Sequence, residues 1–239
     1  MRHSELDFQK RAQLRELMDE PSDRETTRAY LESLSRVNRW FLAMRPTLAW
    51  LDGLELPRNG EPVRILDVGC GYGDGLRRIE RWARERGLRA ELIGLDLNPD
   101  TAAIAAEASD PESRIEWVTS DVFGYASTRK VDMVVSALFT HHLDDDQVVR
   151  FLRWMEANCT VGWFINDLSR APIPYYLFRW FSRLARMHPG VQNDGPISIA
   201  RAFVVDDWLE MCALAGLSAD DVTIREWTPA RICVSRRKL

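Results

Sequence analysis

Buried strands alternate with amphipathic helices from about residue 61 to the end of the sequence. Apolar runs predict five strands, which begin at Val63, Ala90, Arg114, Val131 and Val161. Helical patterns lie between them over 75–86, 99–108 and 145–158. Four of the five runs are apolar on both faces, and only the run from Arg114 alternates. This arrangement predicts an α/β fold with a doubly wound parallel sheet, covered on both sides.

The last part of the chain predicts one more helix, over 205–215, and a hairpin. The strand-like stretches "VTIREW" and "RICVSR" are separated only by "TPA". So short a connection requires that the two strands run antiparallel. We therefore expect five parallel strands followed by a terminal hairpin.

The first sixty residues lie outside this sheet pattern. From Leu6 to about Leu51, apolar residues recur at intervals of three and four, and Pro21 and Ser22 divide the run into two expected helices. A turn-rich stretch follows over 53–62. We therefore divide the chain into an N-terminal helical cap, 1–60, and an α/β domain, 61–239. Within that domain, the insert 171–201 is expected to form a lid.

Composition excludes several classes of protein. The 239 residues are 46% apolar and 28% charged, with a formal net charge of -4 and scattered basic residues, which disfavours a nucleic-acid partner. Four distant cysteines without a C-x-x-C pair predict a reducing, cytoplasmic setting. The charged amino terminus does not resemble a signal peptide, and no uncharged run approaches bilayer length. We therefore expect no transmembrane segment.

A glycine-rich turn follows the first strand. Gly69, Cys70, Gly71 and Gly73 lie between that strand and a helix, where bare backbone lets main-chain amides approach a bound group. The dinucleotide motif G-x-G-x-x-G/A requires a small residue at its sixth position, which is Asp74 here. An NAD-dependent oxidoreductase is therefore a disfavoured alternative.

Three carboxylates follow successive strands and define the expected ligand. Asp67 suits a positive amine and would repel a pyrophosphate. Asp96 can accept hydrogen bonds from ribose hydroxyls. Asp121 can accept from an adenine amine, with Leu97 and Val122 beside the ring. Each aspartate alone also suits a helix cap or a turn, but together they indicate a ligand with an amine, a ribose and an adenine.

The stretches "ILDVGCGYGDG", "GLDLNPD", "SDVF" and "DMVVSALFTHHL" together resemble the class I S-adenosylmethionine-dependent methyltransferases. The resemblance covers roughly residues 63–146, in the order and at the spacing of that family. It implies a Rossmann-like, seven-stranded sheet of order 3-2-1-4-5-7-6, with the last strand antiparallel. It also implies S-adenosyl-L-methionine as cofactor and S-adenosyl-L-homocysteine as product, and it places Ala137 at the cofactor site.

His141 and His142 follow the fourth strand and are the candidate general bases, with His142 preferred because it lies nearer the next helix. They can equally shape the acceptor pocket. A magnesium site of Asp144, Asn166 and Asp167 is an alternative, since catechol-type methyltransferases place an Asp and an Asp-Asn pair at these strand ends. The pair is reversed here, so we expect no metal.

Four residues are assigned to the methyl acceptor: Asn166, Arg170, Tyr175 and Arg201. The stretches "INDLSRAPIPYYL" and "NDGPISIARAF" resemble a bacterial subgroup of these methyltransferases associated with polyketide and aromatic-lipid pathways. This resemblance is the less specific of the two. It places Asp194 and Ser198 near the acceptor pocket together with Arg201. The alternative is a structural loop closed by an ion pair between Asp194 and Arg201.

The stretch 175–187 is cationic and amphipathic. It suits either a cap helix packed over the cleft or a surface that contacts a greasy acceptor or a membrane. Its apolar residues are not confined to one narrow face, so we expect burial on more than one side.

The function predicted from the sequence is methyl transfer to a small apolar or aromatic acceptor, with O-methylation preferred. The alternative from a different class is a non-catalytic S-adenosylmethionine-binding protein. Peripheral membrane contact stays open, and no oligomeric state follows from the sequence.

Overall fold

The computed structural model describes residues 6–56, 61–125 and 130–238. A seven-stranded sheet has the order β3-β2-β1-β4-β5-β7-β6, which confirms the order implied by the resemblance. Its strands are β1 (Val63–Val68), β2 (Ala90–Asp96), β3 (Glu116–Thr119), β4 (Val131–Ala137), β5 (Cys159–Leu168), β6 (Val222–Trp227) and β7 (Arg231–Arg237). The first five are parallel, and β7 is antiparallel to β5 and β6, as the short hairpin connection predicts.

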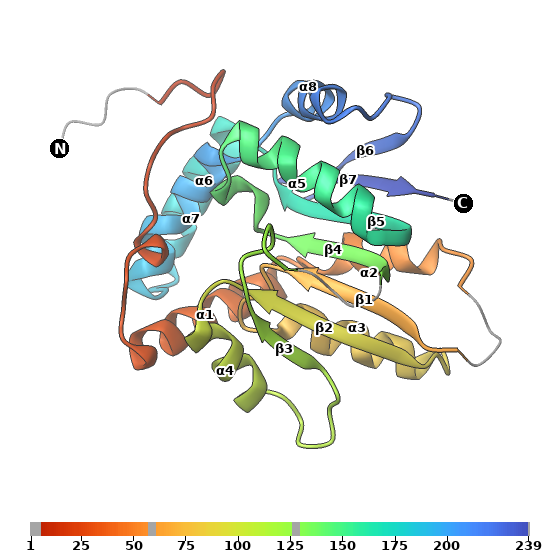
Figure 1. Ribbon diagram of the computed structural model, residues 1–239. Helices are drawn as coiled ribbons and strands as arrows, with labels where there is room; N and C mark the ends of the chain where they lie inside the picture. Colours follow the sequence, from red (N-terminus) through yellow and green to blue (C-terminus); the bar gives the residue numbers. More distant parts are fainter. Residues whose placement is uncertain (1–5, 57–60, 126–129, 239) are drawn as a thin grey trace.

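Helices cover both faces of the sheet (Figure 1). The apolar sides of α2 (Arg45–Asp52) and α3 (Asp74–Glu85) pack on one face. Those of α5 (Asp145–Asn158) and α8 (Val205–Ala215) pack on the other. The Trp50 ring of α2 stacks on Phe164 of β5 with ring centroids 5.2 Å apart, so α2 belongs to the packing of the sheet. The domain boundary near residue 60 stays a prediction.

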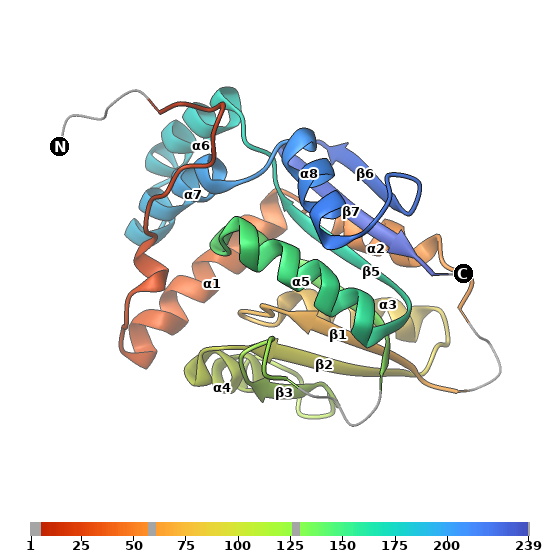
Figure 2. The same cartoon turned by 45° about the horizontal axis from the view of Figure 1, so that its top comes forward.

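The carboxyl ends of the parallel strands face a second group of helices. Figures 1 and 2 show α1 (Arg24–Trp40), α6 (Pro172–Leu184) and α7 (Pro189–Arg201) together beyond this edge. A Cβ atom on Gly195 of α7 would lie 2.1 Å from Phe178 of α6, so these two helices approach closely. The insert 171–201 therefore consists of two packed helices beside the strand ends, where ligands bind in such sheets.

The expectation of a helix before Pro21 is wrong. Residues 6–23 contain only the 3-10 turn η1 (Leu17–Asp19). The apolar side chains that suggested a helical stripe are exposed, 42% for Leu14 and 49% for Leu17. The backbone here forms short turns and also bonds to α7, since Ala12 N donates to the Ala200 carbonyl. We call residues 6–22 the N-terminal segment.

Helix α7 begins with a Pro-Gly pair, Pro189 and Gly190. Pro189 is the first residue of α7, where its missing N–H costs nothing. The His188 side chain caps this helix by accepting from Gly190 N at 3.2 Å. The strand expected from Arg114 begins two residues later, at Glu116.

The expected burial of α6 on more than one side is also wrong. Within this helix only Tyr175 and Ser182 are buried. An apolar stripe consists of Ile173, Leu177, Trp180 and Leu184, which are 71%, 65%, 75% and 86% exposed. Among the described residues, no helix combines the length and apolarity needed to cross a membrane.

Candidate cofactor and active site

The glycine turn joins β1 to α3 at the carboxyl edge of the sheet. Gly69, Gly71 and Gly73 all have positive φ, at 72°, 52° and 75°. Added Cβ atoms on Gly69 and Gly73 would lie 2.6 Å and 2.3 Å from Phe139 and Trp117, so packing explains these two glycines. A Cβ on Gly71 would meet nothing within 4 Å. Gly71 is therefore the glycine whose bare backbone faces open space, as a ligand cradle requires.

Asp96 ends β2 beside this turn. Its carboxylate accepts from Gly71 N at 3.0 Å and from Asn98 N at 3.1 Å, one bond to each oxygen. Each carboxylate oxygen can accept a second hydrogen bond. Burial raises the pKa of Asp96, while these main-chain bonds lower it. The residue expected to bind a ribose is thus fixed in orientation and tied to the glycine turn.

Asp67, near the end of β1, is buried among like charges. Burial and the nearby carboxylates of Asp74 and Asp96 raise its pKa to about 8. No cation contributes to this shift among the described residues. A buried carboxyl in this state favours a positively charged partner, which would restore the ionised form.

The other expected cofactor residues lie along the same edge. Asp121 follows β3, and its side chain accepts from Phe123 N at 3.1 Å. Leu97 is 72% exposed, whereas Val122 is buried in the core, so Leu97 is the one open to a ring. Cys70 is buried and its thiol pKa is raised by burial. Ala137 ends β4, opposite Asn166 of β5.

The two candidate histidines lie on η2 (Thr140–His142), directly after β4. Asp167 of β5, fully buried, lies 2.7 Å from His141 Nδ1 and accepts from His141 N at 3.0 Å. Although burial alone would raise the pKa of Asp167, His141 and Thr140 hold it well below its usual range. His142 Nδ1 lies 3.2 Å from Asp19 of the N-terminal segment. Each imidazole is therefore oriented by a carboxylate.

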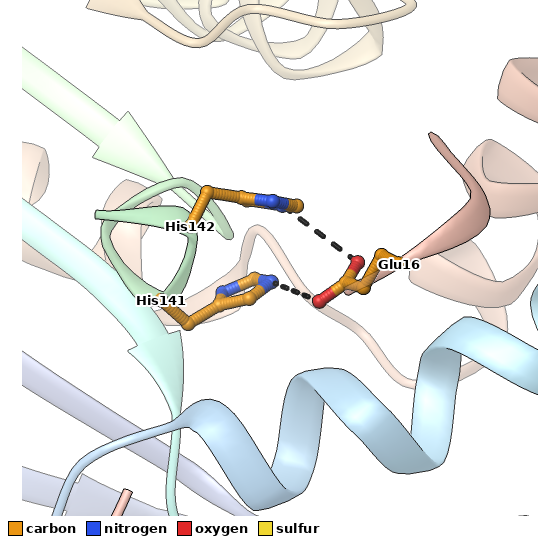
Figure 3. Close-up of side chains that lie close together, drawn as sticks. All are labelled: Glu16, His141 and His142. Atoms are coloured by element: carbon orange, nitrogen blue, oxygen red, sulfur yellow. Dashed lines mark ion pairs between the residues drawn. The ribbon is translucent and has the colours of Figure 1, made fainter. Parts of the chain in front are cut away.

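Both histidines face Glu16, which sequence reasoning missed. Figure 3 shows the imidazoles of His141 and His142 pointing toward its carboxylate, with Nε2 to carboxylate distances of 3.8 Å and 3.9 Å. Burial raises the pKa of Glu16 to about 7, opposed by His142, by Arg201 and by the nearby Ser198 hydroxyl, which donates to the Asp194 carbonyl. Nothing in the local sequence pattern distinguishes Glu16, because its position depends on distant contacts.

Those contacts come from α7 and hold the N-terminal segment against residues 140–143, which we call the histidine turn. Asp194 accepts from Leu17 N at 2.8 Å, from Met18 N at 3.1 Å and from the Tyr30 hydroxyl at 2.7 Å. The alternative of an ion pair between Asp194 and Arg201 is therefore wrong, because these donors occupy Asp194 and Arg201 lies elsewhere.

Arg201 attaches α7 to the histidine turn. It donates to the carbonyls of His141 and His142 at 3.1 Å each and to Asp19 at 3.0 Å. Arg11 adds bonds to the Arg201 and Leu143 carbonyls, both at 2.8 Å. Of the residues assigned to the acceptor, Arg201 is the one that lies beside the histidines.

Asn166, Arg170 and Tyr175 have internal partners instead. The Asn166 amide donates to the Ala43 carbonyl at 2.8 Å and is fully buried. Arg170 forms an ion pair with Asp207 at 2.7 Å and donates to main-chain carbonyls of the N-terminal segment. Tyr175 is buried against neighbouring aromatic rings. These contacts favour structural roles over acceptor contact.

The alternative magnesium set is not brought together either. Asp144 is the N-cap of α5, where it accepts from Gln147 N at 2.8 Å. Asp167 is engaged by His141 and Thr140. The Asn166 amide donates to the Ala43 carbonyl and to the Thr47 hydroxyl of α2. Within the described part of the chain, the group with metal-ligand spacing is Glu16, His141 and His142.

The sheet order and the strand-end site define a class I methyltransferase fold. Residues 65–162 match the family model described as a methyltransferase domain. The match covers the glycine turn, the strand-end aspartates and the histidine turn.

Two curated relatives align with shorter segments. Trans-aconitate 2-methyltransferase of Streptomyces avermitilis is 36% identical over 86 residues, 34% of this chain and 29% of that protein. The 2-phytyl-1,4-naphtoquinone methyltransferase of Thermosynechococcus vestitus is 38% identical over 71 residues, 30% of this chain and 29% of that protein. The matched segments thus span under a third of these relatives.

Solved structures share the fold over most of the chain. The plantazolicin methyltransferase BpumL in complex with SAH has a TM-score of 0.66 and 13% identity, covering 91% of this chain and 92% of that one. A putative O-methyltransferase from Nostoc punctiforme has a TM-score of 0.60 and 16% identity, covering 89% and 60%.

Proposed function

We propose that this chain transfers a methyl group from S-adenosyl-L-methionine to a small acceptor and releases S-adenosyl-L-homocysteine. One observation carries the proposal: Asp67, Gly71 and Asp96 meet at the carboxyl edge of the sheet, where Gly71 faces open space and Asp67 is buried among like charges. A ligand with a cationic amine and ribose hydroxyls complements these groups. The methyltransferase relatives, and the neighbour solved with SAH, support the same cofactor.

The residues at this edge have distinct roles toward the cofactor. When bound, the cofactor supplies an electrophilic methyl group on a sulfonium. Asp67 pairs with the amine, Asp96 accepts from the ribose hydroxyls, and Asp121 accepts from the adenine amine with Leu97 beside the ring. The backbone of the turn at Gly71 approaches the ligand. The helices α1, α6 and α7 lie beyond the strand ends, where they would limit access of water to a displacement that depends on alignment.

The acceptor is expected beside the histidine turn, at the carboxyl ends of the strands. His142 is 20% exposed in its side chain, against 3% for His141, so His142 is our candidate for taking a proton from a hydroxyl acceptor. Asp19 orients His142, and Asp167 orients His141. A proton acceptor at this position favours O-methylation. One relative is named for a phytyl naphthoquinone, which supports an apolar acceptor. The other is named for trans-aconitate, which is a small acid, so carboxylic acids are also candidate acceptors.

The experiment that tests the activity is a screen of phenolic, quinone, polyketide and carboxylic-acid acceptors, with S-adenosylhomocysteine release as the readout. Turnover with any member identifies the acceptor class and supports methyl transfer. A chain that binds the cofactor but never yields S-adenosylhomocysteine supports the non-catalytic alternative. Binding of NAD in place of S-adenosylmethionine would contradict the cofactor assignment. Four free, buried cysteines support our proposal of a cytoplasmic setting.

Cofactor binding is expected to release a proton through Asp67. Its pKa of about 8 keeps the carboxyl largely protonated at pH 7, whereas a cationic amine beside it stabilises the carboxylate. Affinity should therefore rise with pH from about 6 to about 8, because fewer protons remain to be released. Calorimetry at pH 7 in two buffers with different ionisation enthalpies measures the number of protons released.

Asp67→Asn is the matched control, since it keeps the shape and removes the titration. This variant should bind the cofactor more weakly and release fewer protons. Between about pH 4 and pH 8 the Asp67 carboxyl is protonated in the folded, unliganded wild type but ionised in the unfolded chain. The contribution of Asp67 to the free energy of unfolding therefore falls as the pH rises through this range. The variant should lack that loss. Equal proton release in both proteins would exclude Asp67 as the partner of the amine.

We also propose that α6 contacts an anionic bilayer surface, from which an apolar acceptor can be reached. The exposed stripe of this helix consists of large aliphatic and aromatic side chains, namely Ile173, Leu177, Trp180 and Leu184. The helix contains two arginines, Arg179 and Arg183, and no acidic residue, so its charge complements anionic headgroups.

Sedimentation with phosphatidylglycerol and phosphatidylcholine vesicles tests this contact. We expect binding to the anionic vesicles, weakened about tenfold or more by Leu177→Asp. Leu214→Asp is the matched control, because Leu214 is 58% exposed on α8, away from the stripe. Equal effects of the two variants would contradict a specific role for α6. A concentration-dependent dimer without vesicle binding would assign the stripe to a second copy of the chain.

A further inference from the structure

The cluster of Glu16, His141 and His142 has the composition and spacing of a metal site. One ligand-type atom from each residue lies within 4.8 Å of the other two. Two imidazole nitrogens and one carboxylate are a common protein ligand set for zinc and related divalent ions. A tetrahedral site with bonds of about 2.1 Å needs ligand atoms about 3.4 Å apart. The distances of 3.8 Å from Glu16 Oε1 to His141 and 3.9 Å from Glu16 Oε2 to His142 are about 0.5 Å longer than this, and all three ligand atoms lie within 4.8 Å of one another.

The outer contacts of both imidazoles favour metal binding. Asp167 lies on the Nδ1 side of His141 at 2.7 Å, and Asp19 on the Nδ1 side of His142 at 3.2 Å. A proton on each Nδ1, held by a carboxylate, leaves Nε2 as a lone-pair donor directed at Glu16. Metal-binding histidines characteristically have such a carboxylate on the second ring nitrogen, which fixes both the tautomer and the ring orientation.

The third observation is a buried oxygen without a hydrogen-bond donor. Glu16 Oε1 has no hydrogen-bond partner, and the Glu16 side chain is 1% exposed. An unsatisfied buried carboxylate oxygen is costly. Arg201 is 3.6 Å from this atom, but its hydrogen bonds go to Asp19 and to the carbonyls of the histidine turn. The oxygen therefore lacks a partner on the side that faces the imidazoles, where a cation would supply one (Figure 3).

We propose that Glu16, His141 and His142 bind one divalent ion of the zinc type, through the Glu16 carboxylate and the two Nε2 atoms. The fourth position is then open to water or to an oxygen of the acceptor. The carboxylates of Asp19 and Asp167 behind the imidazoles offset the repulsion between the ion and Arg201. This ligand set differs from Asp144, Asn166 and Asp167, and it replaces the expectation of no metal.

The site joins parts of the chain that are distant in sequence. Glu16 belongs to the N-terminal segment, which Asp194 of α7 fixes through two main-chain bonds to η1. Both histidines belong to the turn after β4. A bound ion would link the N-terminal segment to the sheet. It would occupy the Nε2 atoms of both histidines, so direct proton transfer to His142 and metal binding are alternative uses of the same atoms.

Metal binding is measured on the full chain alone, after treatment with a chelator. Titrations with Zn²⁺ by calorimetry, and with Co²⁺ by its visible absorption, should each give one ion per chain and the spectrum of a four-coordinate Co²⁺ site. Glu16→Gln and His142→Ala should each weaken binding about a hundredfold. Asp19→Asn, which alters the outer partner of His142 and an acceptor of Arg201 but no proposed ligand, should weaken it about tenfold.

His188→Ala is the control, since His188 caps α7 and lies outside the cluster. It should bind Zn²⁺ like the wild type. Circular dichroism and melting of each variant establish that the fold is retained. Zn²⁺ affinity unchanged by Glu16→Gln, several ions per chain, or equal loss in His188→Ala would overturn the site. No cofactor or acceptor is present in these titrations, so their outcome is independent of the proposed methyl transfer.

Discussion

Asp96→Ala is expected to reduce affinity for S-adenosylmethionine on the order of a hundredfold. The two charge-assisted bonds to the ribose that we propose for Asp96, at about 1.5 kcal/mol or more each, would account for a loss of this size. The substitution also removes the acceptor of Gly71 N at 3.0 Å, so the glycine turn loses one of its supports. Calorimetric titration with the cofactor measures the change directly.

The control for this variant is Asp132→Ala. Asp132 accepts from Arg64 N at 2.8 Å and from the Thr160 hydroxyl at 3.1 Å, at the opposite edge of the sheet. Both variants should lose about 1–2 kcal/mol of unfolding free energy, because each loses carboxylate hydrogen bonds to neighbouring segments. Cofactor affinity should fall in Asp96→Ala alone. A folded Asp96→Ala protein with wild-type affinity would show that the ribose binds elsewhere.

Gly71→Val is expected to remove detectable cofactor binding. The φ of Gly71 is 52°, and its Cβ would extend into the open space that the ligand is proposed to fill. A branched side chain there blocks the approach of the ligand to the backbone, and the left-handed conformation adds about 1–2 kcal/mol of strain.

Gly87→Val separates these two effects. Gly87 has a φ of 64° and, like Gly71, nothing within 4 Å of an added Cβ, but it follows α3 at the other end of that helix. The strain is therefore similar in both variants, whereas only Gly71 faces the proposed ligand. If the two variants have similar melting temperatures and only Gly71→Val loses cofactor binding, the glycine turn is supported as the site where the backbone contacts the ligand. Equal affinities in the two variants would remove the glycine turn from the site.

The sheet was predictable because its signals are local. The strands at Val63, Ala90 and Val131 begin where the apolar runs begin, since a strand buried on both faces needs a continuous run. The hairpin followed from a three-residue connection. The aspartates at the strand ends were predictable for the same reason, because parallel strands bring their carboxyl ends to one edge.

The surrounding segments were less predictable because their partners are distant. Asn166 follows a strand as a ligand-binding residue would, yet its amide is taken up by Ala43 and Thr47 of the preceding helical region. Apolar spacing near Leu14 suggested a helix, but the backbone there pairs with α7. Glu16 had no local signal at all. Long-range hydrogen bonds of this kind leave no periodic pattern in the sequence.

The attachment of the histidine turn has a consequence for how such a site can diversify. Arg201 and Arg11 hold this turn through the carbonyl oxygens of residues 141, 142 and 143. Every amino acid supplies the same carbonyl, so substitution of either histidine leaves these anchors in place. The side chains of residues 141 and 142 can therefore change during evolution while the bonds that hold the turn are retained. A related protein could thus adapt to another acceptor without a change in the surrounding fold.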